Sequence, residues 1–443
     1  MKRMLAFIRE GTTRDIDAAT VQALREAIAD VAACTIAGAE APVSGIVRRY
    51  AALQHGAGPC SVAAGGERLS PAGAALVNAT MANALDNDDG HRLTKGHPGA
   101  VVFPAALAAA EHVGASGAVF LDAMLVAYET AIRAGIAAHA QRPDYHCTGS
   151  WGAVGAAAGA GRLLGLTEGQ LGHALGIAEY QATYSPMMRC IDAPSMLKDG
   201  IGWGSMAGIG AAYLAREGFT GIPSLFAFAD AEPLLAELGE RYRVNELYYK
   251  PYPCCRWAQP AIEAMIALER THGSLRDRIA SIVIHTFAES SRLIKTYPRD
   301  TEEAQYNLFY PLAAYLAFGE LGPRQALHTL EHPAPRAYMD RMEVRVDPEL
   351  DARFPAKALS RLELRLTSGE MVVSGAMQAR GDYDYPLSSA EKREKFRRLT
   401  VPALGENRSG ELYETIMALD RLDSIGSLVA LMQSDAANGG GAA

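Results

Sequence analysis

The sequence lacks most of the signatures that would assign a chemistry at once. Its six cysteines show no CxxC spacing, no run or face is rich in lysine or arginine, and the formal charge of the 443 residues is −8 at pH 7. An acidic chain without a basic face is not expected to bind nucleic acid. Unpatterned cysteines indicate free thiols, which are typical of a cytoplasmic protein.

Long apolar runs and nucleotide-binding motifs are also missing. The apolar stretches near residues 100–110 and 152–161 are shorter than the roughly 20 residues of a membrane span, and the N-terminus turns polar by Arg9, unlike a secretory signal. We therefore expect no membrane contact. No GxGxxG follows a predicted strand, and neither a P-loop lysine nor a nucleophile-elbow serine is found. These absences argue against dinucleotide, NTP and acyl-transfer chemistry.

What the chain does contain is a long helical pattern rich in small residues, from residue 14 to about 268. Each interior glycine weakens an isolated helix by roughly 0.5–1 kcal/mol, so such segments become favourable only where helix backbones approach closely in a buried bundle. A helix start is indicated at Ser70-Pro71, an N-cap followed by proline at the first helical position. The other expected helices span 15–37, 117–138, 152–164, 168–182 and 202–216.

The pattern changes after residue 270. Strands are expected at 279–287, 342–346, 362–366 and 371–374, the last two flanking a hairpin turn at 368–370, with one helix at 304–321 between them. Helical periodicity returns at 410–433. The sequence therefore predicts a mainly α fold, in which residues 1–269 and 399–443 form an all-helical domain and residues 270–398 form an inserted, smaller α/β domain.

The densest polar cluster runs from Asp86 to His97, with carboxylates at 86, 88 and 89 between two core-type segments. Burying such groups is costly unless they pair or act on a ligand, so the segment is interpreted as a catalytic loop. An EF-hand does not fit, because glycine falls at the fifth position and His97 replaces the required glutamate at the twelfth. A mixed Asp/His site for Mg²⁺ or Mn²⁺ stays open, although a metal-free site is favoured.

Other polar residues precede small-residue helices. Helix N-termini hold carboxylates through free N–H groups, and a nearby cation adds charge-assisted hydrogen bonds. Together they suit a small, multiply charged carboxylate substrate. The alternatives without a functional role are a helix cap for His146, a solvated pair for Lys198 and Asp199, and a rigid connector at 250–253. The residues concerned are Tyr145, His146, Arg189, Lys198, Lys250, Arg256 and Tyr310.

In the order of these motifs the chain resembles the MmgE/PrpD family over nearly its whole length. The family's LDxDD…HP(S/G) segment resembles residues 85–89 and 97–99, and its A-x-(F/Y)-(S/N)-x-x-Y pattern resembles residues 304–310. Its histidine and its two lysines correspond to His146, Lys198 and Lys250. Departures are Gly90, where the family commonly has Thr or Ser, and the additional cations His91 and Arg92.

The resemblance implies a large helical domain, an α/β lid domain, a homodimer and chemistry without a cofactor or metal. It implies a lyase that creates carbanion character next to a carboxylate of a small di- or tricarboxylate. A dehydratase is ranked first, a decarboxylase of a cis-aconitate-like acid and an epimerase or isomerase of an iminodisuccinate-like acid are alternatives, and a carboxylate-binding scaffold is the non-enzyme alternative.

Roles follow from this expectation. One proton-transfer group is Asp86 or His97, and the other is His146 with Tyr145. Lys198 provides charge stabilisation at the reacting centre. The residues expected to bind substrate are Lys250, Arg256, Arg189, His91, Arg92 and, from the lid, Tyr310.

Overall fold

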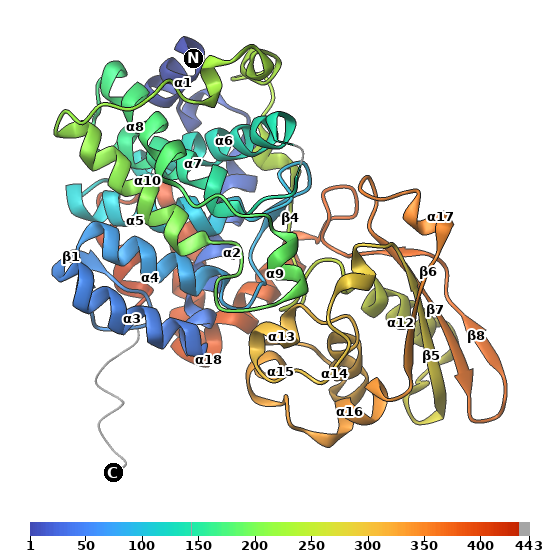
Figure 1. The fold of residues 1–443 in the computed structure, drawn as a ribbon. Helices are drawn as coiled ribbons and strands as arrows, with labels where there is room; N and C mark the ends of the chain where they lie inside the picture. The colour runs from blue at the N-terminus through green and yellow to red at the C-terminus, as the bar shows by residue number, and fades with distance from the viewer. Residues whose placement is uncertain (143, 434–443) are drawn as a thin grey trace.

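The computed structural model describes residues 1–142 and 144–433, and helices dominate it (Figure 1). The first helices are α1 (Lys2–Glu10), α2 (Ala18–Ala37), α3 (Pro42–His55), α4 (Pro71–Asn83), α5 (Pro98–Val113), α6 (Gly117–Gln141), α7 (Thr148–Leu163), α8 (Glu168–Gln181), α9 (Met188–Asp192), α10 (Ile201–Arg216) and α11 (Glu232–Ala236). The later helices are α12 (Gln259–His272), α13 (Thr301–Gln305), α14 (Tyr310–Phe318), α15 (Pro323–His328), α16 (Pro333–Met339), α17 (Pro348–Asp351), α18 (Ser389–Met417) and α19 (Gly426–Leu431). The predicted mainly α class is confirmed.

Helix α7 lies in the middle of the helical part and packs against α5, α6, α8 and α10. Its small residues make this packing possible. A Cβ atom at Gly155 would lie only 2.4 Å from the Ala131 Cβ and 2.7 Å from the Ala127 carbonyl oxygen. The prediction that glycine- and alanine-rich segments form closely packed helices is therefore confirmed here. Among the described residues no single helix has the length and apolar character of a membrane span, and only the combination of Ala18–Glu40 with Pro42–His55, bent by 90°, reaches both.

Helix α4 starts as its sequence predicts, because the Ser70 Oγ accepts a hydrogen bond from the Gly73 N–H at 3.2 Å and Pro71 fills the first helical position. It ends at Asn83, and α5 begins at Pro98. The acidic segment therefore forms a loop that joins two helices of the core.

The longest strands, β5 and β7, lie in one five-stranded sheet. In this sheet β5 is parallel to β6 and antiparallel to β7, and β7 also pairs with β8 and β9. The predicted hairpin is confirmed, with its turn at Gly369 (φ +91°). The strands are β1 (Ala57–Ser61), β2 (Arg68–Leu69), β3 (Gly90–His91), β4 (Leu247–Tyr248), β5 (Ile279–Thr286), β6 (Met342–Val346), β7 (Leu359–Leu366), β8 (Met371–Val373) and β9 (Met377–Gln378).

The expectation of one continuous helix over 304–321 is wrong. The chain breaks between α13 and α14, because the Asn307 Oδ1 accepts hydrogen bonds from the backbone N–H groups of Phe309 (2.9 Å) and Tyr310 (2.8 Å). This side chain satisfies backbone donors that a continuous helix would have paired with carbonyls. The break turns Tyr306 out of the helical register.

The C-terminal helix α18 begins at Ser389, earlier than the expected 410, and packs along α2. Its first turns, with Phe396 and Leu399, belong to the same hydrophobic core as α2 to α8, whereas β5, β7, α12 and α14 share a second core. Figure 1 shows α18 beside the first helices and the sheet on the other side of α12. Helix α18 crosses the predicted boundary at 398–399, and both the domain division and a lid role stay predictions.

Candidate active site

The loop between α4 and α5 is buried, and its three carboxylates are at most 1% exposed. Two of them have structural partners. The Asp88 Oδ1 accepts a hydrogen bond from the Asn83 side chain at 2.9 Å. The Asp89 carboxylate accepts from the Gly99 N–H at 3.0 Å and the Tyr128 hydroxyl at 2.7 Å. These bonds tie the loop to both flanking helices and to α6.

Asp89 is not suited to be a base. Burial, with the nearby Asp30 carboxyl, raises the pKa of Asp89 to about 8, although the Tyr128 hydroxyl opposes the shift. A carboxyl with that pKa holds its proton at pH 7. We therefore assign Asp89 to holding the loop.

Asp86 forms the central ion pair of the site. Its backbone is in the left-handed region (φ +51°), which is uncommon for a residue with a side chain. The Lys250 Nζ lies 2.9 Å from the Asp86 Oδ1 and also donates to the Asp86 carbonyl at 2.9 Å. Burial alone would raise the pKa of the Asp86 carboxyl, but the charges of Lys250 and Lys198 outweigh it and hold that pKa below its usual value. Asp86 is therefore a carboxylate at neutral pH.

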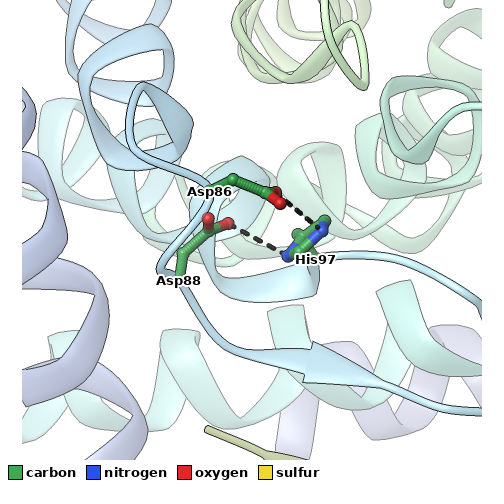
Figure 2. Close-up of side chains that lie close together, drawn as sticks. All are labelled: Asp86, Asp88 and His97. Atoms are coloured by element: carbon green, nitrogen blue, oxygen red, sulfur yellow. Dashed lines mark ion pairs between the residues drawn. The ribbon is translucent and has the colours of Figure 1, made fainter. Parts of the chain in front are cut away.

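His97 lies between two carboxylates (Figure 2). Its Nε2 is 3.6 Å from the Asp86 Oδ1, and its Nδ1 is 3.4 Å from the Asp88 Oδ2. The Nδ1 also lies 2.8 Å from the carbonyl oxygen of Asp89. A carbonyl can only accept, so in the neutral ring Nδ1 carries the proton and Nε2 offers its lone pair. The ring is thus oriented to accept a proton at Nε2.

Asp86, Asp88 and His97 also come close enough together to be tested as a metal site, since one ligand atom from each lies within 4.8 Å of the others. The two carboxylates face opposite nitrogens of the ring (Figure 2), and a metal ion binds an imidazole through only one nitrogen. Lys250 already pairs with Asp86. The arrangement therefore fits proton transfer better than it fits one chelated ion.

A cavity opens beside this loop and joins residues from distant parts of the chain. Polar and charged residues in its lining are Asp86, Arg92, Lys95, His97, Asp199, Lys250 and Arg256. Aromatic residues in its lining are Tyr145, Tyr248, Trp257, Tyr306 and Phe354. The structure thus brings together Asp86, His97, Tyr145, Lys250, Arg256 and Arg92 of the residues that the sequence singled out.

The cations of the cavity differ in their partners. Arg256 forms an ion pair with Asp382. The Arg92 guanidinium donates to the Ala356 carbonyl at 2.9 Å and to the Tyr383 hydroxyl at 2.8 Å, which are both neutral. Lys95 is exposed, and its Nζ lies 5.7 Å from the centre of the Tyr145 ring. Within the described part of the chain neither Arg92 nor Lys95 forms an ion pair, so both are available to an anion. Sequence reasoning missed Lys95.

Asp199 is the second carboxyl of the cavity. Its Oδ1 accepts a hydrogen bond from the Thr148 hydroxyl at 3.0 Å, and its Oδ2 accepts from the Tyr306 hydroxyl at 3.3 Å. Burial raises the pKa of Asp199, and the carboxylate of Asp86 adds to the shift. From the sequence, Asp199 is one member of a possible solvated pair with Lys198. The order of residues does not show that Asp199 is only 1% exposed.

Lys198 lies behind the loop and does not line this cavity. Its Nζ donates to the Asn83 carbonyl and, at 2.6 Å, to the Gln305 Oε1. Burial lowers the pKa of Lys198, while Asp86 opposes the shift. From this position it acts on Asp86 through its charge and holds the end of α4, and direct contact with a substrate in the cavity stays a prediction.

Two predicted residues lie beside the cavity without lining it. The His146 ring stacks on His139 with the ring centres 3.9 Å apart, and burial lowers the pKa of His146. It is the neighbour of Tyr145, which does line the cavity. Arg189 is exposed and lines a separate depression with Cys190 and Trp203.

Two further predicted substrate-binding residues have other partners. The Tyr310 hydroxyl donates to the Gln325 carbonyl at 2.7 Å, which fixes it inside the second core. The His91 ring is 1% exposed, and its Nε2 lies 3.4 Å from Glu246. Neither side chain lines the cavity in this structure, and contact of Tyr310 or His91 with a substrate stays a prediction. Tyr306, from the same sequence motif as Tyr310, lines the cavity because of the break after α13.

Comparisons with known proteins show the family of the chain. Residues 2–231 match the MmgE/PrpD N-terminal domain, and residues 252–421 match the MmgE/PrpD C-terminal domain. The chain is 25% identical to the cis-aconitate decarboxylase-like protein oryM of Aspergillus oryzae, over 97% of this chain and 96% of that protein. It is also 25% identical to a cis-aconitate decarboxylase of Aspergillus terreus, over 95% of this chain and 93% of that protein. The chain therefore belongs to the MmgE/PrpD family, whose members named here are lyases of the decarboxylase type.

Proposed function

We propose that the chain is a lyase that acts on a small di- or tricarboxylate by creating carbanion character next to a carboxylate. The observation that carries the proposal is the position of the His97 Nε2, 3.6 Å from the carboxylate of the buried Asp86–Lys250 ion pair, in one cavity with Arg92 and Lys95, which form no ion pair among the described residues. A base, a fixed positive charge and free anion-binding groups are what this chemistry requires.

The cavity supports a small, anionic substrate. The cavity has a volume of about 70 Å³, and one water needs roughly 10–15 Å³ of such volume, so the cavity has room for about five to seven waters. That volume suits a short carboxylic acid. Arg92 and Lys95 at the rim, with Lys250 inside, supply charge for two or more carboxylates.

The proton transfers can be assigned to named groups. For decarboxylation, the bond between a carboxylate carbon and its neighbour breaks, CO₂ leaves, and the electron pair stays on the neighbouring carbon. The ammonium of Lys250 stabilises this negative charge. The carbon then takes a proton from the Tyr145 hydroxyl or from Asp199, because burial raises the pKa of Asp199 and so favours its protonated form. Dehydration and epimerisation instead begin with loss of a C–H proton, and His97 is the group placed to remove it.

Dehydration is the second candidate and uses the same groups. His97 takes the proton next to the carboxylate, and Asp199 or Tyr145 protonates the departing hydroxide. The family resemblance alone ranks dehydration first, whereas the relatives found here carry the name cis-aconitate decarboxylase and favour decarboxylation. We therefore place decarboxylation first for this chain. Return of the proton to the opposite face would make the chain an epimerase.

The test is incubation of the whole protein in D₂O with cis-aconitate, citrate and malate, followed by NMR. Loss of CO₂ with deuterium on the product carbon supports decarboxylation, and a new alkene from citrate or malate supports dehydration. Binding without either would support the scaffold alternative and overturn the proposal.

A pair of variants ties turnover to the cavity. His97→Asn should lower kcat about 10²–10⁴-fold, the usual range for loss of a proton-transfer residue. His112→Asn, at an exposed position near the end of helix α5, should keep it. Tyr145→Phe and His146→Phe then distinguish the two neighbours: the position of Tyr145 in the lining predicts the larger loss for Tyr145→Phe. Full activity of a folded His97→Asn protein would refute the assignment of the base.

A further inference from the structure

Gly90 allows an aromatic side chain to reach the cavity. Strands β3 and β4 are antiparallel, and Gly90 lies directly opposite Tyr248. A Cβ atom at Gly90 would lie 2.1 Å from the Tyr248 Cζ and 2.2 Å from its hydroxyl oxygen. The end of the Tyr248 ring therefore lies where any side chain at position 90 would begin. A substitution at Gly90 must push this ring away.

The Tyr248 ring has little freedom to move. Tyr248 is 6% exposed, and it lines the cavity beside Lys250 and Arg256. The Arg256 guanidinium carbon lies 4.8 Å from the centre of the ring, a cation–π contact. Asp382 forms an ion pair with the same guanidinium. The ring and Asp382 together fix the direction in which Arg256 presents its donors.

We propose that Tyr248, which fits only because residue 90 is glycine, is the specificity-determining residue of the cavity. Its ring closes one end and limits the length of the substrate. It also orients Arg256 toward a terminal carboxylate, which a planar guanidinium binds with two hydrogen bonds. The proposal rests on the proposed function and names its substrate class: short polycarboxylates, with homologues one methylene longer excluded by the ring.

The experiment compares cis-aconitate with cis-homoaconitate, which is one methylene longer, as substrates and as ligands in calorimetric titration. One methylene in a fitted pocket changes kcat/KM about 10–200-fold. Tyr248→Ala should therefore shift the ratio of kcat/KM for the two acids at least tenfold toward the longer one. Tyr248→Phe keeps the ring and should keep the wild-type ratio.

Gly90 supplies the second arm of the test. Gly90→Ala should raise KM for cis-aconitate tenfold or more, because its Cβ drives the ring into the cavity. Adding Tyr248→Ala to Gly90→Ala should remove that penalty. If Gly90→Ala has the same effect with and without the ring, or if Tyr248→Ala leaves the ratio within threefold of wild type, the inference is wrong. If the wild type neither binds nor converts either acid, the proposed function itself fails.

Discussion

Lys250→Met tests the central ion pair. Methionine keeps an unbranched side chain of similar length, and it removes only the positive charge and the donors of the ammonium. Lys250 and Asp86 are each 2% exposed at the side chain, and their charged atoms lie 2.9 Å apart. Solvent therefore cannot replace the lost partner. The variant leaves a buried carboxylate beside Lys198 and His97.

The expected cost is large on the scale of protein stability. Removing one partner of a buried ion pair destabilises a protein by about 3–5 kcal/mol. The charge of Lys198, which also lowers the pKa of Asp86, remains in the variant, so we expect a value near the lower end, about 3 kcal/mol. Asp86→Leu combined with Lys250→Met removes both charges and should cost less than the sum of the two single variants by more than about 1 kcal/mol.

The stability loss caused by Lys250→Met should depend on pH. The folded-state pKa of Asp86 lies below its ordinary value, so the carboxylate stabilises the fold above pH 3.8, and this contribution is lost as the pH falls through the folded pKa. Without Lys250, burial is less opposed and the pKa of Asp86 rises. The variant can then escape its unpaired charge by taking up a proton in mild acid. The loss caused by Lys250→Met should therefore be greatest at pH 7 and shrink toward pH 5.

The assay is denaturant unfolding of wild type, both single variants and the double variant at pH 7 and pH 5, with the slopes compared to verify a common transition. Lys250→Arg is the matched control, because it keeps the charge. The reasoning is refuted if Lys250→Met costs under about 1 kcal/mol at pH 7, if its cost grows on acidification, or if the single costs are additive.

Other predictions concern the loop and the rim of the cavity. The pKa of Asp89 is raised to about 8, so its contribution to stability falls as the pH rises from about 4 to 8, by up to roughly 1.4 kcal/mol per pH unit. Asp89→Asn should flatten this dependence of stability on pH in unfolding titrations. An unchanged dependence would contradict the assignment of Asp89. Lys395 donates to the Asn87 carbonyl at 2.7 Å, so Lys395→Met should lower kcat about 10–100-fold by displacing the loop, whereas Lys392→Met, which changes a partly exposed pair with Glu26, should not. Lys95→Met should raise KM and spare kcat in steady-state kinetics, and a selective loss of kcat would contradict its role in binding.

The acidic loop could be predicted because the sequence alone shows that charged residues would be buried there, at a cost in free energy. Charged residues between two core-type segments must be paired or act on a ligand, and Asp86 and His97 are both paired. Lys250 could be placed from its resemblance to the family motif. The hairpin at 368–370 and the N-cap at Ser70 follow from local chemistry, and such features depend little on distant contacts.

The positions of the remaining site residues could not be predicted, because tertiary contacts and unusual backbone angles determine them. Tyr306 reaches the cavity only because the Asn307 side chain ends a helix, and the surrounding residues favour a continuous one. Asp86, Lys95 and Lys198 all adopt positive φ angles (+51°, +53° and +44°), a conformation that residue propensity argues against. Such departures gather at functional sites, where surrounding contacts enforce them.

Helix α18 has a consequence for the synthesis of the protein. The bond between Lys395 and the Asn87 carbonyl joins residues 308 positions apart. At about 5–20 residues per second, a ribosome that has just made the loop needs roughly 15–60 s more to reach Lys395. During that time the acidic loop of the nascent chain lacks the hydrogen bond from Lys395, and helix α2 lacks its packing partner α18. A chain that stops before residue 395 therefore forms the acidic loop without this hydrogen bond, and its helix α2 without the contacts of α18.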